Sequence, residues 1–306
     1  MHQITSSILM VRPANFGFNF DTADNNSFQI KDETLTKNQI AQSARNEFDI
    51  FTNILKEAGI QLHIHHEAEG TQSTDSIFPN NWFSSHTDGS LITYPMFSQK
   101  RRTERRSGVI EQLGDTFKIK KRLKLEKWER KGLYLEGTGS MVLDRVNKIA
   151  YACRSNRTDE VVLDEFCDVM GYSKILFDAL DKNGFPIYHT NVMMAIGTSF
   201  VVVCLESVRH KGQRDRLLKS FEQKQKDIIE ISLYQMERFA GNMIQVKSIN
   251  DDHFLVMSTA SFDSLDKEQR TKIEEHTNIL HSDLNVIETY GGGSARCMIA
   301  EVFLPS

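Results

Sequence analysis

The chain has 306 residues, of which 40% are hydrophobic and 25% charged, a balance typical of soluble globular proteins. Its net charge of −4 argues against a general affinity for nucleic acid or membrane surfaces. The longest apolar run, residues 200–205, is too short to span a bilayer, and no clean domain boundary interrupts the chain.

Four cysteines occur, and none has the CxxC spacing of a zinc ribbon: Cys153, Cys167, Cys204 and Cys297. This usage argues against a disulfide framework and fits a reducing compartment. The first residues lack the basic-then-apolar pattern of a signal peptide. We therefore expect a cytoplasmic protein.

The first elements are a buried strand at 7–11, a helix at 36–58 and a strand at 60–64. Thr36 and Gln39 form a capping-box pattern at the start of this helix. The polar loop at 14–31 carries several phenylalanines and is interpreted either as a lid or as a plain surface loop.

Three histidines follow in the strand that begins at residue 60. His63 and His65 would share one face of the strand, with His66 on the other, but no acidic or cysteine partner stands near them to complete a metal site. We expect no metal there.

A turn with two amides comes next, at Pro79-Asn80-Asn81, flanked by apolar residues and Trp82. It indicates either polar amides held at a structured site or an ordinary Asx turn. A strand is expected at 90–94. The basic runs at 100–106 and 118–131 are interrupted by acidic residues, which favours a solvated face over a nucleic-acid groove.

From residue 133 onward, a pattern of strand, strand, helix and strand recurs. The first such unit has a strand, a glycine turn and a strand within 133–143, a strand at 149–153, a helix from Thr158 or Asp159 to 170 and a strand at 174–177. The second has strands at 186–195 and 199–205, a helix at 213–225 and a strand at 227–231. The third has strands at 242–247 and 253–257, a helix at 264–276 and a strand at 284–287. The whole chain holds about four or five such units of about 50 residues, which favours a closed, propeller-like α/β array over a solenoid.

Near the C-terminus, three glycines at 291–293 precede Cys297, which opens an apolar, strand-like run. A glycine loop brings backbone N–H groups close to a ligand, so a cysteine at its end can be presented to a small molecule. The alternative is a small buried cysteine that only packs.

The polar residues that stand at first strands or first turns of different units would converge in a closed array. They are Asp75, Asn80, Asn81, Glu136, His189 and Cys297. A cysteine, a histidine and carboxylates in one place are the components of a cysteine-nucleophile site.

In this order, the motifs resemble the pentein superfamily of guanidine-modifying enzymes. The resemblance spans nearly the whole chain and rests on the segments Asp75–Asn81, Glu136-Gly-Thr-Gly, Ser155-Asn-Arg157-Thr, His189-Thr-Asn and Gly291–Cys297. The segment Phe-Pro-Asn-Asn-Trp-Phe-Ser looks most like the citrulline-utilisation branch, often labelled amidinotransferase-like. The resemblance implies a five-fold pseudosymmetric α/β propeller of ββαβ units, with residues 1–306 as one catalytic domain.

The chain departs from the family pattern at two places. Asn80 and Asn81 stand where relatives carry Glu and Asp, and Gly139 stands where they carry Asp. Both changes remove negative charge from the expected position of a guanidinium, while amides suit a neutral ureido group. The departures favour a citrulline-like substrate, although Asp75 and Glu136 remain.

The resemblance implies roles for each residue and no metal or organic cofactor. Cys297 attacks the substrate carbon, His189 is the acid and base, Glu136 orients His189 or a substrate N–H, and Asp75, Asn80 and Asn81 hold the head group. Arg157 is the candidate for the substrate α-carboxylate, and Arg296 is a further substrate-site candidate that adds positive potential beside Cys297.

The expected function is hydrolysis of citrulline to ornithine, ammonia and carbon dioxide. The alternatives are an arginine deiminase or amidinotransferase-like enzyme and, from another class, a non-catalytic pentein such as a ribosome-binding factor. The expected partner is a small ureido or guanidino amino acid rather than nucleic acid or membrane, and a homo-oligomer remains open.

Overall fold

The computed structural model describes residues 2–19, 28–29, 34–71, 73–106 and 108–306. Five three-stranded sheets occur in this part of the chain, and all have one plan: the middle strand is antiparallel to one neighbour and parallel to the other. The predicted repeat of ββαβ units is therefore confirmed, and the fold is the pentein-like α/β arrangement.

The sheets are built from consecutive strands, except that the last strand of the chain joins the first sheet. They are β15 (Ala300–Glu301), β1 (Ser7–Arg12) and β2 (Gln61–His66); β3 (Phe83–Ser85), β4 (Ser90–Thr93) and β5 (Lys121–Lys124); β6 (Met141–Asp144), β7 (Ile149–Cys153) and β8 (Ser173–Phe177); β9 (Met194–Ile196), β10 (Phe200–Val203) and β11 (Asp227–Glu230); and β12 (Ile244–Lys247), β13 (His253–Ser258) and β14 (Asn278–Ser282).

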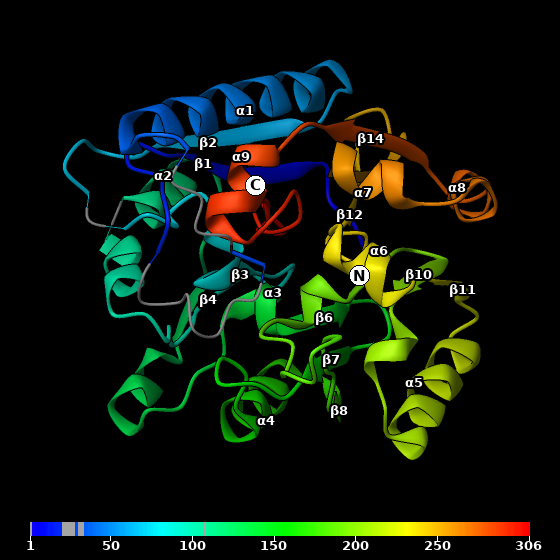
Figure 1. The fold of residues 1–306 in the computed structure, drawn as a ribbon. Coiled ribbons are helices and arrows are strands. Elements are labelled where there is room, and N and C mark those ends of the chain that lie inside the picture. The colour runs from blue at the N-terminus through cyan, green and yellow to red at the C-terminus, as the bar shows by residue number, and fades with distance from the viewer. Residues whose placement is uncertain (1, 20–27, 30–33, 72, 107) are drawn as a thin grey trace.

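Each parallel pair needs a crossover, and helices supply it. The helices are α1 (Lys37–Glu57), α2 (Val109–Thr116), α3 (Gly137–Ser140), α4 (Glu160–Met170), α5 (Lys211–Gln223), α6 (Leu233–Glu237), α7 (Thr259–Ser264), α8 (Lys267–Glu274) and α9 (Asn285–Gly291). Figure 1 shows α1, α4, α5 and α8 at the periphery, outside the strands. The predicted capping box of α1 is present, since Thr36 and Gln39 bond each other's backbone N–H groups.

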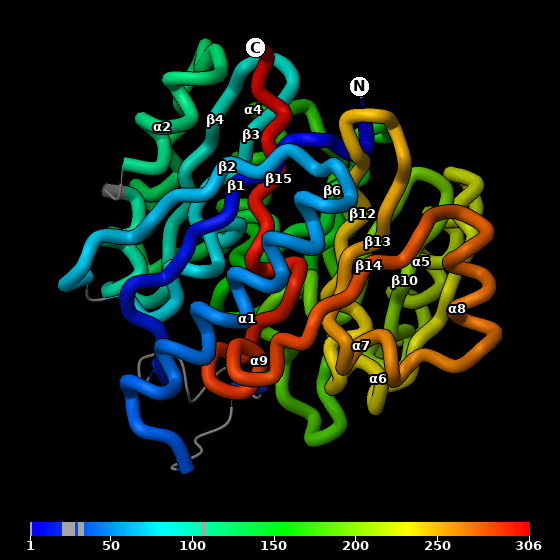
Figure 2. The backbone as a smooth tube through the Cα atoms, turned by 90° about the horizontal axis from the view of Figure 1, so that it is seen from above, coloured from blue at the N-terminus to red at the C-terminus, as the bar shows by residue number. Residues whose placement is uncertain are grey.

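The two ends of the chain meet in one sheet. Ile8 and Leu9 of β1 pair with Glu301 and Ala300 of β15, and Figure 2 shows β1 between β2 and the red β15. The first strands of the units also touch each other, because β15 contacts β3, and β9 contacts both β6 and β12. The turns that precede these strands therefore lie near one another.

Four predicted elements were wrong. The strand expected at 186–195 is reduced to β9, because a 3₁₀ turn at Thr190–Val192 precedes it. The strand expected at 284–287 is the start of α9, because the Glu47 carboxylate on α1 accepts the N–H groups of Val286 and Ile287 at this helix N-terminus. The returning strand is β14 instead. Residues 133–136 form only an isolated bridge from Leu135 to Thr158, since the chain turns at Gly137.

The fourth error concerns the glycine stretch. Gly291 is the last residue of α9, Gly292 has the left-handed conformation that ends it, and Cys297 lies in a turn before β15 rather than in a strand. The structure also contains β3 and β5, which the apolar pattern did not indicate, since β5 reads Lys-Arg-Leu-Lys. None of the described helices is long and apolar enough to cross a membrane.

Candidate active site

The turns before five first strands supply the polar residues of the site. A 3₁₀ turn at Pro79–Asn81 precedes β3, α3 precedes β6, a 3₁₀ turn at Thr190–Val192 precedes β9, and α3 contacts both 3₁₀ turns. Asn242 comes just before β12, and Cys297 comes just before β15. The predicted convergence of these segments is present in the fold.

Cys297 is almost fully buried in its turn, where its N–H donates to the carbonyl of Ser294 at 3.0 Å. Its Sγ accepts hydrogen bonds from Asn242 Nδ2 at 3.2 Å and from Asn191 Nδ2 at 3.5 Å. A Cβ at Gly293 would lie 2.9 Å from the Phe78 ring and 3.3 Å from the Cys297 Cβ, so there is no room for a side chain at that position. The turn therefore holds the sulfur in one place among amides.

His189 is paired with Glu136. The Nε2 of His189 lies 2.8 Å from Glu136 Oε2, and Phe97 N–H donates to Glu136 Oε1 at 2.9 Å. Burial opposes ionisation of Glu136, but Arg157, His189 and Arg101 outweigh it and lower the pKa of Glu136 to about 2. An ionised carboxylate can only accept, so Nε2 carries the proton and Nδ1 holds a lone pair.

Burial lowers the pKa of His189 to about 4, although the bond from Glu136 opposes this shift. The imidazole is therefore mostly neutral near pH 7, with Nδ1 as its basic atom. A Cβ at Gly139 would lie 2.8 Å from this Nδ1 and 2.5 Å from Asn81 Nδ2. Glycine at this position thus opens the space between the base and the amide, and a family-like aspartate would occupy it.

The segment Asp75–Asn81 is organised by a buried arginine. Arg101 donates to Asn81 Oδ1 at 2.7 Å and to the Phe78 carbonyl at 2.9 Å, and it forms a salt bridge with Glu104 at 2.9 Å. Asn81 Nδ2 donates to Asn80 Oδ1 at 3.0 Å. The Nδ2 of Asn80 is buried without a hydrogen-bond partner among the described residues.

Asp75 is buried and bonded to the N-terminal loop. Asn19 Nδ2 donates to Asp75 Oδ2 at 2.7 Å. Burial raises the pKa of Asp75, while Arg101 and the Asn19 bond counteract the shift. Phe28 packs edge-on against the Tyr188 ring at 6.0 Å. The described parts of the 14–31 loop therefore contact the site, whereas residues 20–27 and 30–31 lie outside the described residues, and the lid remains a prediction.

Two arginines from the sequence prediction have different surroundings. Arg157 is buried, approaches Glu136 Oε2 at 3.6 Å and lies over the Tyr188 ring at 4.8 Å, inside the site. Arg296 points its guanidinium at the Ile299 carbonyl, 2.8 Å away, and at Glu301, 3.0 Å away. The Arg296 side chain therefore binds Glu301 of β15 and the carbonyl of Ile299, the residue just before that strand.

Sequence reasoning missed four residues that hold the site together: Asn19, Arg101, Asn191 and Asn242. Asn242 stands in the same position before β12 as Asn81 does before β3. An alignment of the repeated units with one another would therefore have identified Asn242. Arg101 lies in a basic run that looked solvated, and no local pattern distinguishes it from its exposed neighbours. Asn191 lies in the His189-Thr-Asn motif, but the sequence predicted no role for it.

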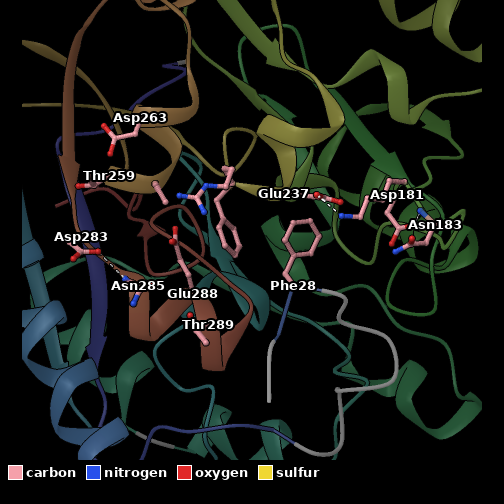
Figure 3. Close-up of a pocket in the computed structure, with 14 residues that line it drawn as sticks. Phe28, Asp181, Asn183, Glu237, Thr259, Asp263, Asp283, Asn285, Glu288 and Thr289 are labelled. Atoms are coloured by element: carbon pink, nitrogen blue, oxygen red, sulfur yellow. Dashed lines mark hydrogen bonds and ion pairs between the residues drawn. The ribbon is translucent and has the colours of Figure 1, made fainter. Parts of the chain in front are cut away.

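A cleft of about 650 Å³ lies next to the site. Figure 3 shows its lining, which includes Glu288 on α9 and Phe28, the residue that also packs on Tyr188. Cys297, His189 and Glu136 do not line this cleft, so the reacting groups are covered by side chains. Within the described residues, no cluster of histidine, cysteine and acidic side chains could hold a metal ion.

Several solved structures have a similar fold. The N-terminal domain of ArgZ, an arginine dihydrolase of the ornithine–ammonia cycle in cyanobacteria, was solved with bound product; it is 15% identical, with 98% of this chain and 99% of that one covered, at a TM-score of 0.73. A dimethylarginine dimethylaminohydrolase adduct with S-methyl-L-thiocitrulline is 16% identical, covering 97% and 99%, at a TM-score of 0.66.

A third structure is a cysteine-to-alanine variant of AgrE with L-arginine, 17% identical over 98% of this chain and 40% of that one, at a TM-score of 0.74. No curated protein matches the sequence. The fold and the family match define a hydrolase of the pentein type that acts on carbon–nitrogen bonds. The chain belongs to the family described as N,N dimethylarginine dimethylhydrolase, eukaryotic, whose model matches residues 12–304.

Proposed function

We propose that the chain hydrolyses a carbon–nitrogen bond of a ureido or guanidino amino acid through a covalent intermediate on Cys297, with citrulline as the preferred substrate. Citrulline and one water give ornithine, ammonia and carbon dioxide. The observation that supports this proposal most directly is that Arg101 donates a hydrogen bond to the side-chain carbonyl of Asn81, while the carbonyl of Asn80 accepts from Asn81. The Asn80–Asn81 pair therefore offers only N–H donors to a substrate. Donors match the carbonyl oxygen of a urea and find no acceptor on a guanidinium.

The chemistry needs only the residues of the site. The Cys297 proton goes to Nδ1 of His189, and the thiolate attacks the ureido carbon. His189 then protonates the departing ornithine nitrogen as the carbon–nitrogen bond breaks, which leaves a carbamoyl group on sulfur. A water loses its proton to His189 and breaks the carbon–sulfur bond, and the released carbamate decomposes to ammonia and carbon dioxide.

The remaining site residues bind and orient. Glu136 fixes the tautomer of His189 through the 2.8 Å bond. Asp75, Asn80 and Asn81 hold the planar head group, and Arg157 stays our candidate for the substrate α-carboxylate. For Arg296 the bonds to Ile299 and Glu301 favour a supporting role at the turn over direct substrate contact.

A second substrate, arginine, is favoured by the charge of the site. Arg101 is paired with Glu104, and Arg157 with Glu136, whereas the side-chain hydrogen bonds to the Asp75 carboxylate come from the neutral groups of Asn19 and Thr74. An ionised Asp75 would leave one negative charge for a cationic guanidinium to match. On this site arginine would first lose ammonia to give citrulline, which the same cysteine could then hydrolyse.

The direct test is a time course with citrulline, arginine, agmatine and dimethylarginine, in which ornithine, citrulline and ammonia are all quantified. We expect ornithine from citrulline at the highest kcat/KM. Conversion of arginine to citrulline with no ornithine from either substrate would replace the proposal with a deiminase. Group transfer without release of ammonia would replace hydrolysis.

We also propose that residues 1–306 act as one catalytic domain, which the shared sheet of β1 and β15 supports. The four cysteines are free, which supports a reducing cytoplasm as the location.

A further inference from the structure

Cys297 must become a thiolate to react, yet no cation is hydrogen-bonded to its sulfur among the described residues. His189 is mostly neutral near pH 7 because burial lowers its pKa to about 4. The guanidinium of Arg296 is bonded to Ile299 and Glu301. Burial also raises the pKa of Tyr188, whose hydroxyl donates to the Gly292 carbonyl, so this neighbour stays neutral too.

The sulfur instead faces amide N–H groups, and the orientation of the nearer amide is determined by its other contacts. Asn242 Oδ1 accepts the backbone N–H of Arg296 at 3.1 Å, and Asn242 Nδ2 donates to the backbone carbonyl of Asn191 at 2.9 Å. A backbone N–H can only donate and a carbonyl can only accept, so the amide cannot be reversed. Its second N–H therefore points at Cys297 Sγ, 3.2 Å away.

The second amide and the local packing complete the arrangement. Asn191 Nδ2 lies 3.5 Å from the same sulfur, and both asparagines are fully buried. A Cβ at Gly241 would clash with the Val192 carbonyl oxygen and lie 2.7 Å from the Met193 carbonyl carbon. Gly241 therefore has no room for a side chain, and this close approach brings Asn242 onto the turn that carries Asn191. The Asn191 Oδ1 is buried without a partner among the described residues, which leaves an acceptor for a substrate N–H.

We propose that the side-chain amides of Asn191 and Asn242 form a neutral cradle that stabilises Cys297 as a thiolate once its proton has passed to His189, and that aims the sulfur at the substrate. The inference rests on the proposed function only in taking Cys297 as the nucleophile. Hydrogen bonds from neutral donors to an anion are worth more than those to a neutral thiol, so the amides favour ionisation and add to the electrostatic attraction between the sulfur and Arg296.

The test measures thiolate formation without any substrate. The ultraviolet absorbance of the thiolate is measured as a function of pH for the parent and for Asn242→Asp. The absorbance of Cys297→Ala is subtracted, so that the remaining signal comes from Cys297. Burial raises the pKa of the other cysteines to about 12 for Cys153 and Cys167 and about 11 for Cys204, so they stay silent near neutral pH.

In Asn242→Asp the side chain can still accept the Arg296 N–H, but it no longer donates to the sulfur and instead faces it with a carboxylate, and both changes disfavour the thiolate. We expect the midpoint of Cys297 ionisation to move up by about one to two pH units and iodoacetamide labelling at pH 7 to slow by about tenfold or more. The matched control is Asn278→Asp, an exposed amide on β14 that donates to the His253 carbonyl of the neighbouring strand β13, which should not move the midpoint.

Asn191→Asp serves as the second variant if Asn242→Asp does not fold, as judged by circular dichroism. An unchanged midpoint in either folded variant would overturn the cradle. Because no substrate is involved, this result is separate from failure of the proposed reaction, which is decided by turnover.

Discussion

The guanidinium of Arg101 donates to the side-chain carbonyl of Asn81 at 2.7 Å, and this bond determines which way the amide faces. An arginine has no acceptor, so the Asn81 carbonyl must point to it and the NH₂ group must point elsewhere. One N–H goes to Asn80 at 3.0 Å. The other is available to an acceptor, which a urea has and a guanidinium lacks.

We predict that Asn81→Asp shifts the substrate preference from citrulline towards arginine. The new carboxylate would pair with Arg101 and remove the donor, so kcat/KM for citrulline should fall by about tenfold or more relative to that for arginine. Steady-state kinetics with both substrates, and Asn278→Asp as a control, measure the ratio. An unmoved ratio would mean that Asp75 and Glu136 alone set the preference.

Gly139 offers a steric test of the site. An alanine Cβ would lie 2.5 Å from Asn81 Nδ2 and 2.8 Å from His189 Nδ1, closer than real contacts allow. Gly139→Ala should therefore displace the base and lower kcat by about a hundredfold or more, since small misplacements of catalytic groups are costly. In Gly114→Ala on α2, the Cβ would meet only Ile119 at 3.8 Å, and activity should match the parent. Near-parent activity of Gly139→Ala would refute this geometry.

His189 predicts a pH dependence of stability. Its pKa is about 4 in the folded protein against 6.5 for an ordinary histidine, so the unfolded chain takes up a proton first as pH falls. The parent should lose up to about 2 kcal/mol of unfolding free energy through this group between about pH 6.5 and pH 5. Urea unfolding of His189→Gln should lack this component, and the exposed-histidine variant His2→Gln should retain it.

Glu288 predicts the opposite trend with pH. Burial raises the pKa of this carboxyl to about 7, while Ser258 and Ser294 counteract the shift; ionising it in the folded state thus costs stability as pH rises above about 4.5. Glu288→Gln can still accept from Ser294 and should be more stable than the parent at pH 8, by roughly 1–3 kcal/mol, but not at pH 5. Thermal unfolding with the exposed Glu274→Gln as control checks this, and an equal gain at both pH values would contradict it.

Much of the site was predictable because its residues occupy equivalent places in a repeat. Glu136, His189 and Cys297 each stand in the turn before the first strand of a unit, and motif order in the sequence is enough to find such positions. The burial of Arg101 and the bond from Asn19 to Asp75 were not predictable, since they depend on segments far apart in the chain.

The same limit explains the errors in the fold. The start of α9 is stabilised by Glu47, which lies more than two hundred residues earlier, so the local apolar pattern of Leu284–Ile287 looked like a strand. The charged strand β5 carries almost no apolar signal and is recognised only by its pairing with β4.

The most direct measurement is ornithine formation from citrulline by the parent, by Cys297→Ala and by the control Cys204→Ala, whose cysteine is buried in the core. Parallel circular dichroism shows that each protein is folded. We predict equal amounts of ornithine and ammonia from the parent and from Cys204→Ala, and a loss of about a thousandfold or more in Cys297→Ala. Activity of Cys297→Ala within tenfold of the parent, or no ornithine from citrulline with any of the three proteins, would contradict the account.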